Sequence, residues 1–208
     1  MAQYLSIHPT HPQRRLVRLA ADTVRRGGLI AYPTDSCYAL GCRLGEARAL
    51  ERLRAVRALD ARHHLTLMCR DLSEIARYAM LDDARFSLLK RVTPGSYTFI
   101  LRARRELPRR AATRKTIGVR IPGHAVAHAL LEELDEPMLS ATLALPGERR
   151  ALADAGEIRA RLERRLDLII DSGACGIEPS TVIDLSAEQA QVLRAGRGSL
   201  EPFDVQRV

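Results

Sequence analysis

The chain has 208 residues, of which 46% are hydrophobic and 28% charged, and its formal net charge is +8. These values are typical of one soluble globular domain that is large enough to bury a full core. No apolar run approaches the roughly 18 residues that a membrane helix needs, and the first dozen residues lack the apolar core of a signal peptide. Four cysteines without a C-x-x-C pair predict free, mostly buried thiols in a reducing cytoplasm.

Hydrophobic periodicity predicts helices that alternate with strands early in the chain, while the later strands come closer together. This order favours an α/β domain with a mixed sheet. The expected elements are a helix at 12–26, a strand at 29–31, a helix at 46–59, a strand at 65–69, a helix capped by Asp71 or Ser73, a helix through Phe86 and Leu89, strands at 97–101 and 116–122, a helix at 125–134, a strand at 138–142, a helix at 157–166, and strands at 168–170, 181–185 and 191–194.

Residues 32–41, with the sequence YPTDSCYALG, follow the first of these strands. Pro33 removes a backbone donor and forces a turn, and several side chains that form hydrogen bonds come directly after it. Ligands of open α/β sheets bind in the crevice beyond the carboxyl ends of strands, so this stretch is a candidate binding site. The alternative is that Thr34 and Asp35 merely cap the next turn.

Further polar clusters lie where predicted strands begin or end. Together they would supply hydroxyl and guanidinium groups to one crevice, a lining that fits an anionic ligand because arginine binds carboxylate and phosphate with two parallel hydrogen bonds. Each cluster taken alone is equally compatible with an ordinary turn. The chain contains no P-loop, dinucleotide fingerprint, zinc-protease motif or serine-hydrolase elbow. The clusters are 62–64, 120–124, 140–142, 179–181 and 194–196.

The segment 102–115 carries seven basic residues and a single acidic one, Glu106. A compact basic segment favours a phosphate-rich partner, either nucleic acid or a nucleotide. The alternative is a solvated loop without a specific partner. The basic residues are Arg102, Arg104, Arg105, Arg109, Arg110, Arg114 and Lys115.

Residues 32–41 resemble the Y-P-T-[DE]-[ST]-x-Y-[AG]-L-G signature of the YrdC-like superfamily. Other motifs follow in the superfamily's order: TPG at 93–95 with Thr98, GVRIP at 118–122, PSTVID at 179–184 and LRAG at 193–196. The chain looks closest to the YciO branch, through 7–9, 65–72, 99–101 and 137–140. The resemblance covers roughly residues 14–196 and leaves 197–208 as a C-terminal tail.

The resemblance implies a twisted open mixed sheet with flanking helices and a basic concave cavity. Superfamily members of known activity are threonylcarbamoyl-AMP synthases, which use L-threonine, bicarbonate and ATP with Mg²⁺ and release diphosphate. Their product feeds the t6A modification of tRNA, and binding of double-stranded RNA and tRNA has been ascribed to the cavity surface. For this chain the resemblance implies synthesis or hydrolysis of the adenylate. A non-catalytic protein that binds double-stranded RNA is the alternative, and the oligomeric state stays open.

The resemblance also implies residue roles. Catalysis would depend on alignment and charge neutralisation more than on a protein nucleophile, because a carbamate is joined to an α-phosphate. Arg120 would hold the threonine carboxylate. The implied substrate-binding residues are Thr34, Tyr38, His63, Arg120 and Thr142, and the implied nucleotide-binding residues are Arg57, Ser180, Thr181 and Arg194.

Two positions depart from the synthase pattern. The synthase K-x-R pair aligns with residues 57–59, where Leu59 removes a charge, and the S-x-N motif aligns with 142–144, where Ala144 removes an amide. Arg57 in place of lysine is a minor change, since only two of the 33 basic residues are lysines. The two losses cost several kcal/mol of contacts at a triphosphate site, at about 1.5–3 kcal/mol per charged hydrogen bond. The same losses look typical of the YciO branch.

Overall fold

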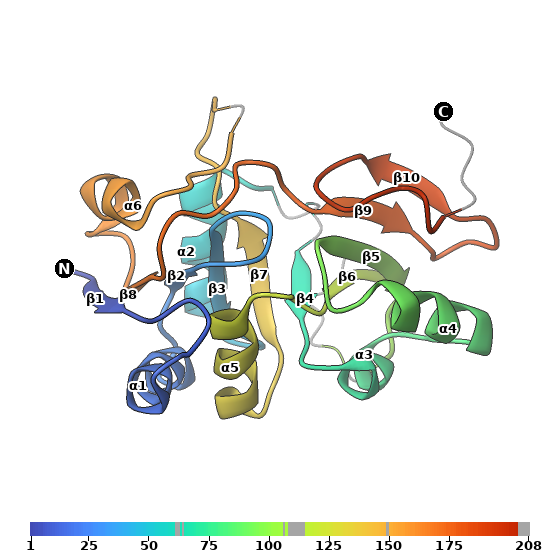
Figure 1. Ribbon diagram of the computed structural model, residues 1–208, viewed down its shortest axis with the longest axis horizontal. Coiled ribbons are helices and arrows are strands. Elements are labelled where there is room, and N and C mark those ends of the chain that lie inside the picture. Colours follow the sequence, from blue (N-terminus) through green and yellow to red (C-terminus); the bar gives the residue numbers. More distant parts are fainter. Residues whose placement is uncertain (61–62, 64, 106, 108–114, 149, 204–208) are drawn as a thin grey trace.

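The computed structural model describes residues 1–208 apart from 61–62, 64, 106, 108–114, 149 and 204–208 (Figure 1). Helices and strands alternate through most of the chain, as the periodicity predicts. In chain order the elements are β1 (Gln3–Ser6), α1 (Arg14–Arg25), β2 (Ile30–Tyr32), β3 (Ala39–Arg43), α2 (Ala47–Arg57), β4 (Thr66–Met68), α3 (Leu72–Tyr78), α4 (Asp83–Val92), β5 (Tyr97–Arg102), β6 (Thr116–Arg120), α5 (Ala125–Leu134), β7 (Met138–Thr142), α6 (Ala155–Leu162), β8 (Leu168–Asp171), β9 (Thr181–Asp184) and β10 (Gln191–Arg194).

The described strands form one mixed sheet in the order β1-β8-β2-β3-β7-β4-β6-β5-β9-β10. The pairs β1–β8, β2–β8, β4–β6 and β5–β9 are parallel, and the other neighbouring pairs are antiparallel. Helices flank this sheet (Figure 1). The predicted α/β fold with a mixed sheet and flanking helices is therefore confirmed.

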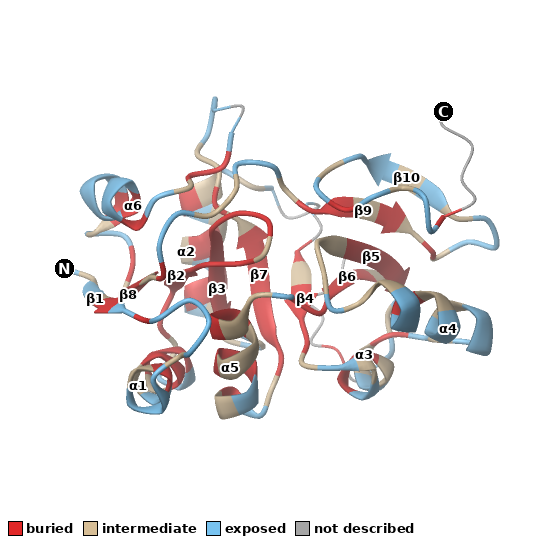
Figure 2. Cartoon of the chain, in the orientation of Figure 1, coloured by how far each residue is buried: buried red, intermediate tan, exposed pale blue. Residues whose placement is uncertain are grey.

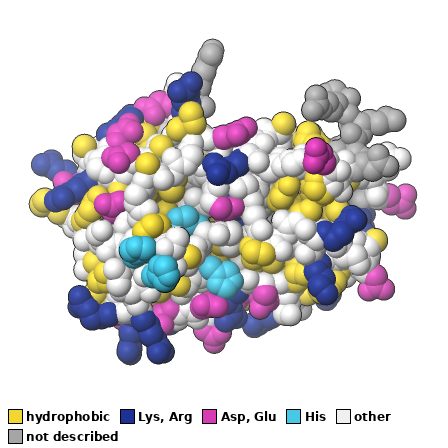
Figure 3. All heavy atoms as spheres, viewed as in Figure 1, with side chains coloured by type: hydrophobic (Ala, Val, Ile, Leu, Met, Phe, Trp, Pro, Cys, Tyr) yellow, Lys and Arg dark blue, Asp and Glu magenta, His cyan; other side chains and the backbone are white. Residues whose placement is uncertain are grey.

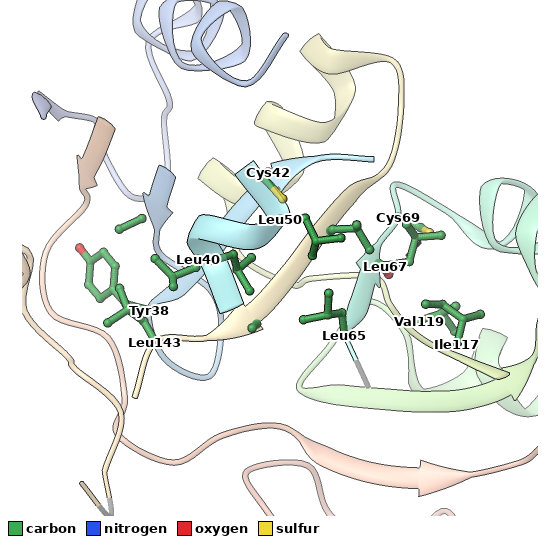
Figure 4. Close-up of a cluster of buried hydrophobic side chains, with 14 of the residues drawn as sticks. Tyr38, Leu40, Cys42, Leu50, Leu65, Leu67, Cys69, Ile117, Val119 and Leu143 are labelled. Atoms are coloured by element: carbon green, nitrogen blue, oxygen red, sulfur yellow. Dashed lines mark hydrogen bonds between the residues drawn. The ribbon is translucent and has the colours of Figure 1, made fainter. Parts of the chain in front are cut away.

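Each face of the sheet carries a cluster of buried side chains. Because side chains alternate along a strand, neighbouring residues belong to opposite clusters. Ile30 and Tyr32 pack with α1 and α5 on one face, whereas Ala31 points into a second cluster that includes residues of α2, α3, α4 and α6. Figure 2 shows the consequence: the strands are mostly buried, while the helices are exposed on their outer sides. Figure 4 shows the second cluster where β3, α2, β4 and β6 meet.

Aspartate side chains cap three of the helices and fix where they begin. Asp71 accepts a hydrogen bond from the Glu74 backbone N–H at 2.7 Å, so Asp71, and not Ser73, is the cap of α3. Asp154 caps α6 in the same way, which places the helix start at Ala155, two residues before the predicted start. Such caps satisfy backbone donors that the first helical turn leaves unpaired.

The sheet extends beyond the predicted boundary at residue 14. β1 pairs in parallel with β8. The sequence pattern of β1 does not predict a strand, because Leu5 is its only buried residue. The predicted tail also packs on the domain: the Phe203 ring is buried, with its centroid 5.5 Å from that of Tyr97. β3 is a further strand that the sequence analysis did not separate from the stretch 32–41.

The four cysteines are free, and Cys37, Cys42 and Cys69 are buried while Cys175 is partly exposed, as predicted. None of the described helices has the length and apolar character needed to span a membrane.

Candidate functional site

A cavity of about 360 Å³ lies over the middle of the sheet. Its floor comes from side chains two residues apart on single strands, which point to the same face because of strand alternation: Thr66 and Met68 on β4, and Ser140 and Thr142 on β7. Thr66 lies directly opposite Ser140 in the β4–β7 register. The cavity thus lies on the face of the sheet and extends to strand ends, as the sequence analysis expected, because Thr34 and Ser36 follow β2 and Arg120 is the last residue of β6.

The other half of the floor comes from β5 and β9. Thr98 and Ile100 of β5 line the cavity together with Val182, which is the register partner of Thr98. Gly118 lies between Thr66 and Ile100 in the sheet, and a Cβ atom there would come within 3.0 Å of the Leu65 carbonyl oxygen. A side chain at this position would therefore crowd the floor.

Three guanidinium groups line the cavity, those of Arg57, Arg120 and Arg194, and the described lining residues include no Asp or Glu. Arg57 is the last residue of α2, and its buried Nε has no hydrogen-bond partner among the described residues. Burial lowers the pKa of Arg57 and that of Arg194. Desolvated cations of this kind favour an anionic ligand, because an opposite charge restores the interaction that water no longer provides.

Arg120 is held in place by the turn that follows β2. Its Nη2 donates to Asp35 Oδ1 at 2.8 Å, and its Nη1 donates to Ser36 Oγ at 3.0 Å. Its Nε is buried without a partner in the described part of the chain. The Arg120 side chain is 7% exposed, so this remaining N–H is a donor that a ligand in the cavity can satisfy.

Asp35, which is not among the residues that line the cavity, forms an ion pair with Arg120. Its carboxylate also accepts hydrogen bonds from the Gly123 backbone N–H at 3.0 Å and the Ser96 hydroxyl at 2.7 Å. Burial alone would raise the pKa of Asp35, but Arg120 and these hydrogen bonds outweigh it and bring the pKa below its usual value. The carboxylate is therefore charged and fully engaged in orienting Arg120.

Thr34 both caps a turn and lines the cavity. Its hydroxyl donates to the Cys37 carbonyl oxygen at 2.7 Å and accepts from the Ser36 backbone N–H at 3.2 Å. The same residue is among those that line the cavity. The two interpretations of this turn in the sequence analysis are therefore compatible.

Ser180 and Arg194 form the opposite wall. Arg194 Nε and Nη2 donate to the Ser180 carbonyl oxygen at 3.1 and 2.9 Å, and the Ser180 hydroxyl lies 2.8 Å from that of Thr98. Thr181 lies behind this wall, outside the cavity lining, because its hydroxyl donates to the Gly198 carbonyl oxygen at 2.6 Å. Thr181 therefore anchors the segment that follows β10.

Tyr38 is the predicted site residue that the structure places farthest from its expected role. Its side chain is fully buried, and its hydroxyl donates to the Gly173 carbonyl oxygen at 2.9 Å. Figure 4 shows this hydroxyl pointing away from Leu65, which lines the cavity. Tyr38 directly precedes β3, and its side chain packs in the same cluster as Leu40 and Cys42, whereas Ala39 lines the cavity. Its contact with substrate stays a prediction.

The structure brings most of the other predicted site residues together. Arg57, His63, Arg120, Thr142, Ser180 and Arg194 line the same cavity as Thr34. Leu59 and Ala144 do not line it. Ser36 and Ser140, which belong to the candidate stretches 32–41 and 140–142 but had no implied role, also line the cavity. The sequence analysis placed Thr66 in no candidate cluster and gave Thr98 no site role; the signal that could have found them is strand alternation combined with register, and register is not visible in one sequence.

Part of the basic segment 102–115 lies outside the described residues, including Arg109, Arg110 and Arg114. Of its described members, Arg102 and Arg104 donate through Nε to the carbonyl oxygens of Ser186 and Ala79. On the face shown in Figure 3, basic and acidic side chains are interspersed. Within the described ranges, no group of three or more His, Cys, Asp or Glu side chains is placed to hold a metal ion.

Comparison with known proteins places this site in a family. A family model for Sua5, YciO and YrdC proteins, described as "Telomere recombination", matches residues 22–196. The chain belongs to the Sua5/YciO/YrdC family. The Escherichia coli K12 protein YciO is 50% identical over 205 residues, which cover 98% of this chain and 100% of that protein. The resemblance to the YrdC-like superfamily and its YciO branch is therefore confirmed.

Synthases of the family are also similar to this member. A threonylcarbamoyl-AMP synthase of Chromobacterium violaceum is 35% identical over 188 residues, which cover 89% of this chain and 96% of the synthase. Among solved structures, E. coli YciO matches with a TM-score of 0.95 at 50% identity, covering 98% of this chain and 100% of YciO. P. abyssi Sua5 in complex with L-threonine matches with a TM-score of 0.86 at 26% identity, covering 93% of this chain and 57% of Sua5.

Proposed function

We propose that the cavity binds a nucleotide together with an L-threonine-derived group, and that the protein carries out threonylcarbamoyl-AMP chemistry. The reaction is either the formation of this adenylate from ATP, L-threonine and bicarbonate or its hydrolysis. The observation that carries the proposal is a hydroxyl-lined cavity with three guanidinium groups, two of which keep a buried N–H without a partner. Support comes from the family's synthases and from the Sua5 complex with L-threonine.

We propose the following roles for the residues of the cavity. Arg120, oriented by Asp35, binds the threonine carboxylate through its Nε–H and through a second N–H that the bonds to Asp35 and Ser36 leave free. Arg57 faces the phosphate, and the Ser180–Arg194 wall faces the nucleoside. The chain neutralises charge that develops on the phosphate while the carbamate oxygen bonds to the α-phosphorus and diphosphate leaves. We propose that Mg²⁺ enters as the ATP complex.

The proposal is tested by mixing the protein with ATP, Mg²⁺, L-threonine and bicarbonate and measuring release of AMP and diphosphate. Release that depends on threonine supports synthesis. Loss of added threonylcarbamoyl-AMP, with release of AMP, supports hydrolysis. If neither reaction occurs and AMP does not bind to the protein in calorimetry, the proposal is wrong.

Arg57→Met should weaken AMP binding while leaving the protein at least as stable as before. Arg57 is desolvated and its Nε lacks a partner, so an apolar side chain of similar length removes a cost from the folded state. The loss of a charged hydrogen bond should raise the Kd for AMP about 10- to 100-fold. Calorimetric titration measures the AMP affinity, and thermal melting measures the stability. Unchanged AMP affinity would mean that the phosphate of AMP does not bind at Arg57.

We also propose that RNA is a partner, through the basic segment 102–115, and that the activity contributes to t6A modification of tRNA. The net charge of +8 and the seven basic residues in this window favour it. Binding to structured RNA should then weaken steeply as salt rises, because each neutralised phosphate releases counterions. A filter-binding titration in which affinity does not change between low and high salt would exclude this partner, and binding without turnover would favour the non-catalytic alternative.

A further inference from the structure

The hydroxyl of Tyr38 forms hydrogen bonds with one loop between β8 and β9. We call residues 172–179 of this loop the strap. It donates to the Gly173 carbonyl oxygen at 2.9 Å and lies 3.3 Å from the Ser172 backbone N–H, which donates to it. The ring is 0% exposed and packs in the core beside Leu40 and Leu143 (Figure 4). A rigid part of the core thus holds the first two residues of the strap.

The strap then passes against the turn that follows β2. A Cβ atom at Gly176 would lie 2.5 Å from the Ser36 carbonyl oxygen, so only glycine allows this approach. A backbone hydrogen bond from Thr34 reaches the Cys175 thiol, and burial raises the pKa of that thiol to about 11. The strap is therefore fitted to the turn that carries the threonine side of the proposed site.

The strap ends at the nucleotide side of the cavity. Pro179 is its last residue, and Ser180 follows directly, with the carbonyl oxygen that accepts both hydrogen bonds from Arg194. The Pro179 carbonyl oxygen accepts from the Arg197 backbone N–H at 3.0 Å. A shift of the strap would therefore move Ser180 and release Arg194 from its position.

We infer that Tyr38 is a positioning residue, whose hydroxyl sets the nucleotide wall of the cavity through the strap without touching the ligand. This inference rests on the proposed binding of a nucleotide. It separates two residues of the same stretch: Thr34 lines the cavity, whereas Tyr38 acts on Ser180 and Arg194 from the far side of the sheet. The threonine side stays in place, because Arg120 is held independently by Asp35 and Ser36.

The test compares Tyr38→Phe with wild type in calorimetric titrations of AMP and, separately, of L-threonine. Loss of this hydroxyl should raise the Kd for AMP about three- to tenfold, the worth of one neutral hydrogen bond, and leave the Kd for L-threonine unchanged. Tyr78→Phe is the matched control, since it removes a tyrosine hydroxyl at the end of α3, a helix whose residues do not line the cavity. The control should bind both ligands as wild type does.

A second variant, Gly173→Ala, perturbs the strap at the residue that accepts the Tyr38 hydrogen bond, because Gly173 has a φ of +83° that alanine rarely adopts, and it should give the same selective loss of AMP affinity. This variant decides the matter if Tyr38→Phe does not fold. If wild type binds no AMP, the proposed function fails and the inference with it. If wild type binds AMP, two results overturn the inference alone: unchanged AMP affinity in the folded variants, or an equal loss for both ligands, which marks a merely structural role.

Discussion

Replacing Arg120 by methionine should abolish the threonine-dependent release of AMP and diphosphate. Arg120 supplies the one guanidinium that the turn after β2 orients toward the cavity, through Asp35 and Ser36. Two charged hydrogen bonds to a carboxylate, at about 1.5–3 kcal/mol each, correspond to a loss of at least about a hundredfold in kcat/KM for threonine. The loss should appear in threonine-dependent turnover, measured as diphosphate release.

The same substitution should also destabilise the fold. The Arg120 and Asp35 side chains are only 7% and 18% exposed, and removing one member of such a pair leaves the other charge buried, at a cost of about 3–5 kcal/mol. Arg120→Met combined with Asp35→Asn removes both charges and should recover most of the stability without recovering turnover. Urea denaturation measures the recovery.

Arg43→Met is the matched control for this pair. Arg43 pairs with Glu136 at 2.7 Å on the surface, where the two side chains are 46% and 29% exposed and an ion pair contributes about 0–1 kcal/mol. We expect wild-type turnover and nearly wild-type stability. If the folded Arg120→Met/Asp35→Asn protein keeps wild-type turnover, the carboxylate does not bind at Arg120.

Restoring the synthase residues should have the second largest effect, and in the opposite direction. The double variant Leu59→Arg/Ala144→Asn returns the cation and the amide in which this chain departs from the synthase pattern. Leu59 and Ala144 do not line the cavity, so this gain requires the longer arginine and asparagine side chains to extend into it. Each hydrogen bond that they form with the triphosphate, at about 1.5–3 kcal/mol, corresponds to a 10- to 100-fold rise in kcat/KM for ATP. Threonine-dependent diphosphate release at limiting ATP measures this gain.

The control for this gain is Leu59→Met/Ala144→Ser, which changes both positions without restoring the cation or the amide. Leu59 is partly buried against the core, so methionine preserves its packing. Turnover in this control should stay at the wild-type level. If Leu59→Arg/Ala144→Asn shows no gain either, the missing cation and amide do not limit synthesis. Hydrolysis of the adenylate or RNA binding is then the favoured function.

The order of elements was predictable because the periodicity of apolar residues reflects packing on the sheet. α5 and β7, for example, begin and end at the predicted residues. β1 was not predictable, since a four-residue edge strand with one buried side chain carries almost no periodic signal. Packing of residues after 196 was missed for a related reason: it depends on Phe203, a single ring that meets Tyr97 and Phe99 only in three dimensions.

The site was predictable where its residues lie in local motifs. Thr34 and Arg120 were found because proline, polar and basic residues cluster around them. Thr66 was not, since it looks like an ordinary strand residue and only the β4–β7 register brings it opposite Ser140. The motif marks Tyr38 as an important residue without showing which way its side chain points where the chain enters β3.

The position of β8 has a consequence for how the chain folds as it is synthesised. β8 lies between β1 and β2, so two of the earliest segments to leave the ribosome meet only through a strand made much later. Until the chain has passed Asp171, one edge of β2 has no partner and β1 has none at all. Domains fold as units once their sequence is complete, and pairing between distant segments is slow. This half of the sheet therefore closes near the end of translation, and the cavity is completed last, when Ser180, Val182 and Arg194 follow the strap out of the ribosome.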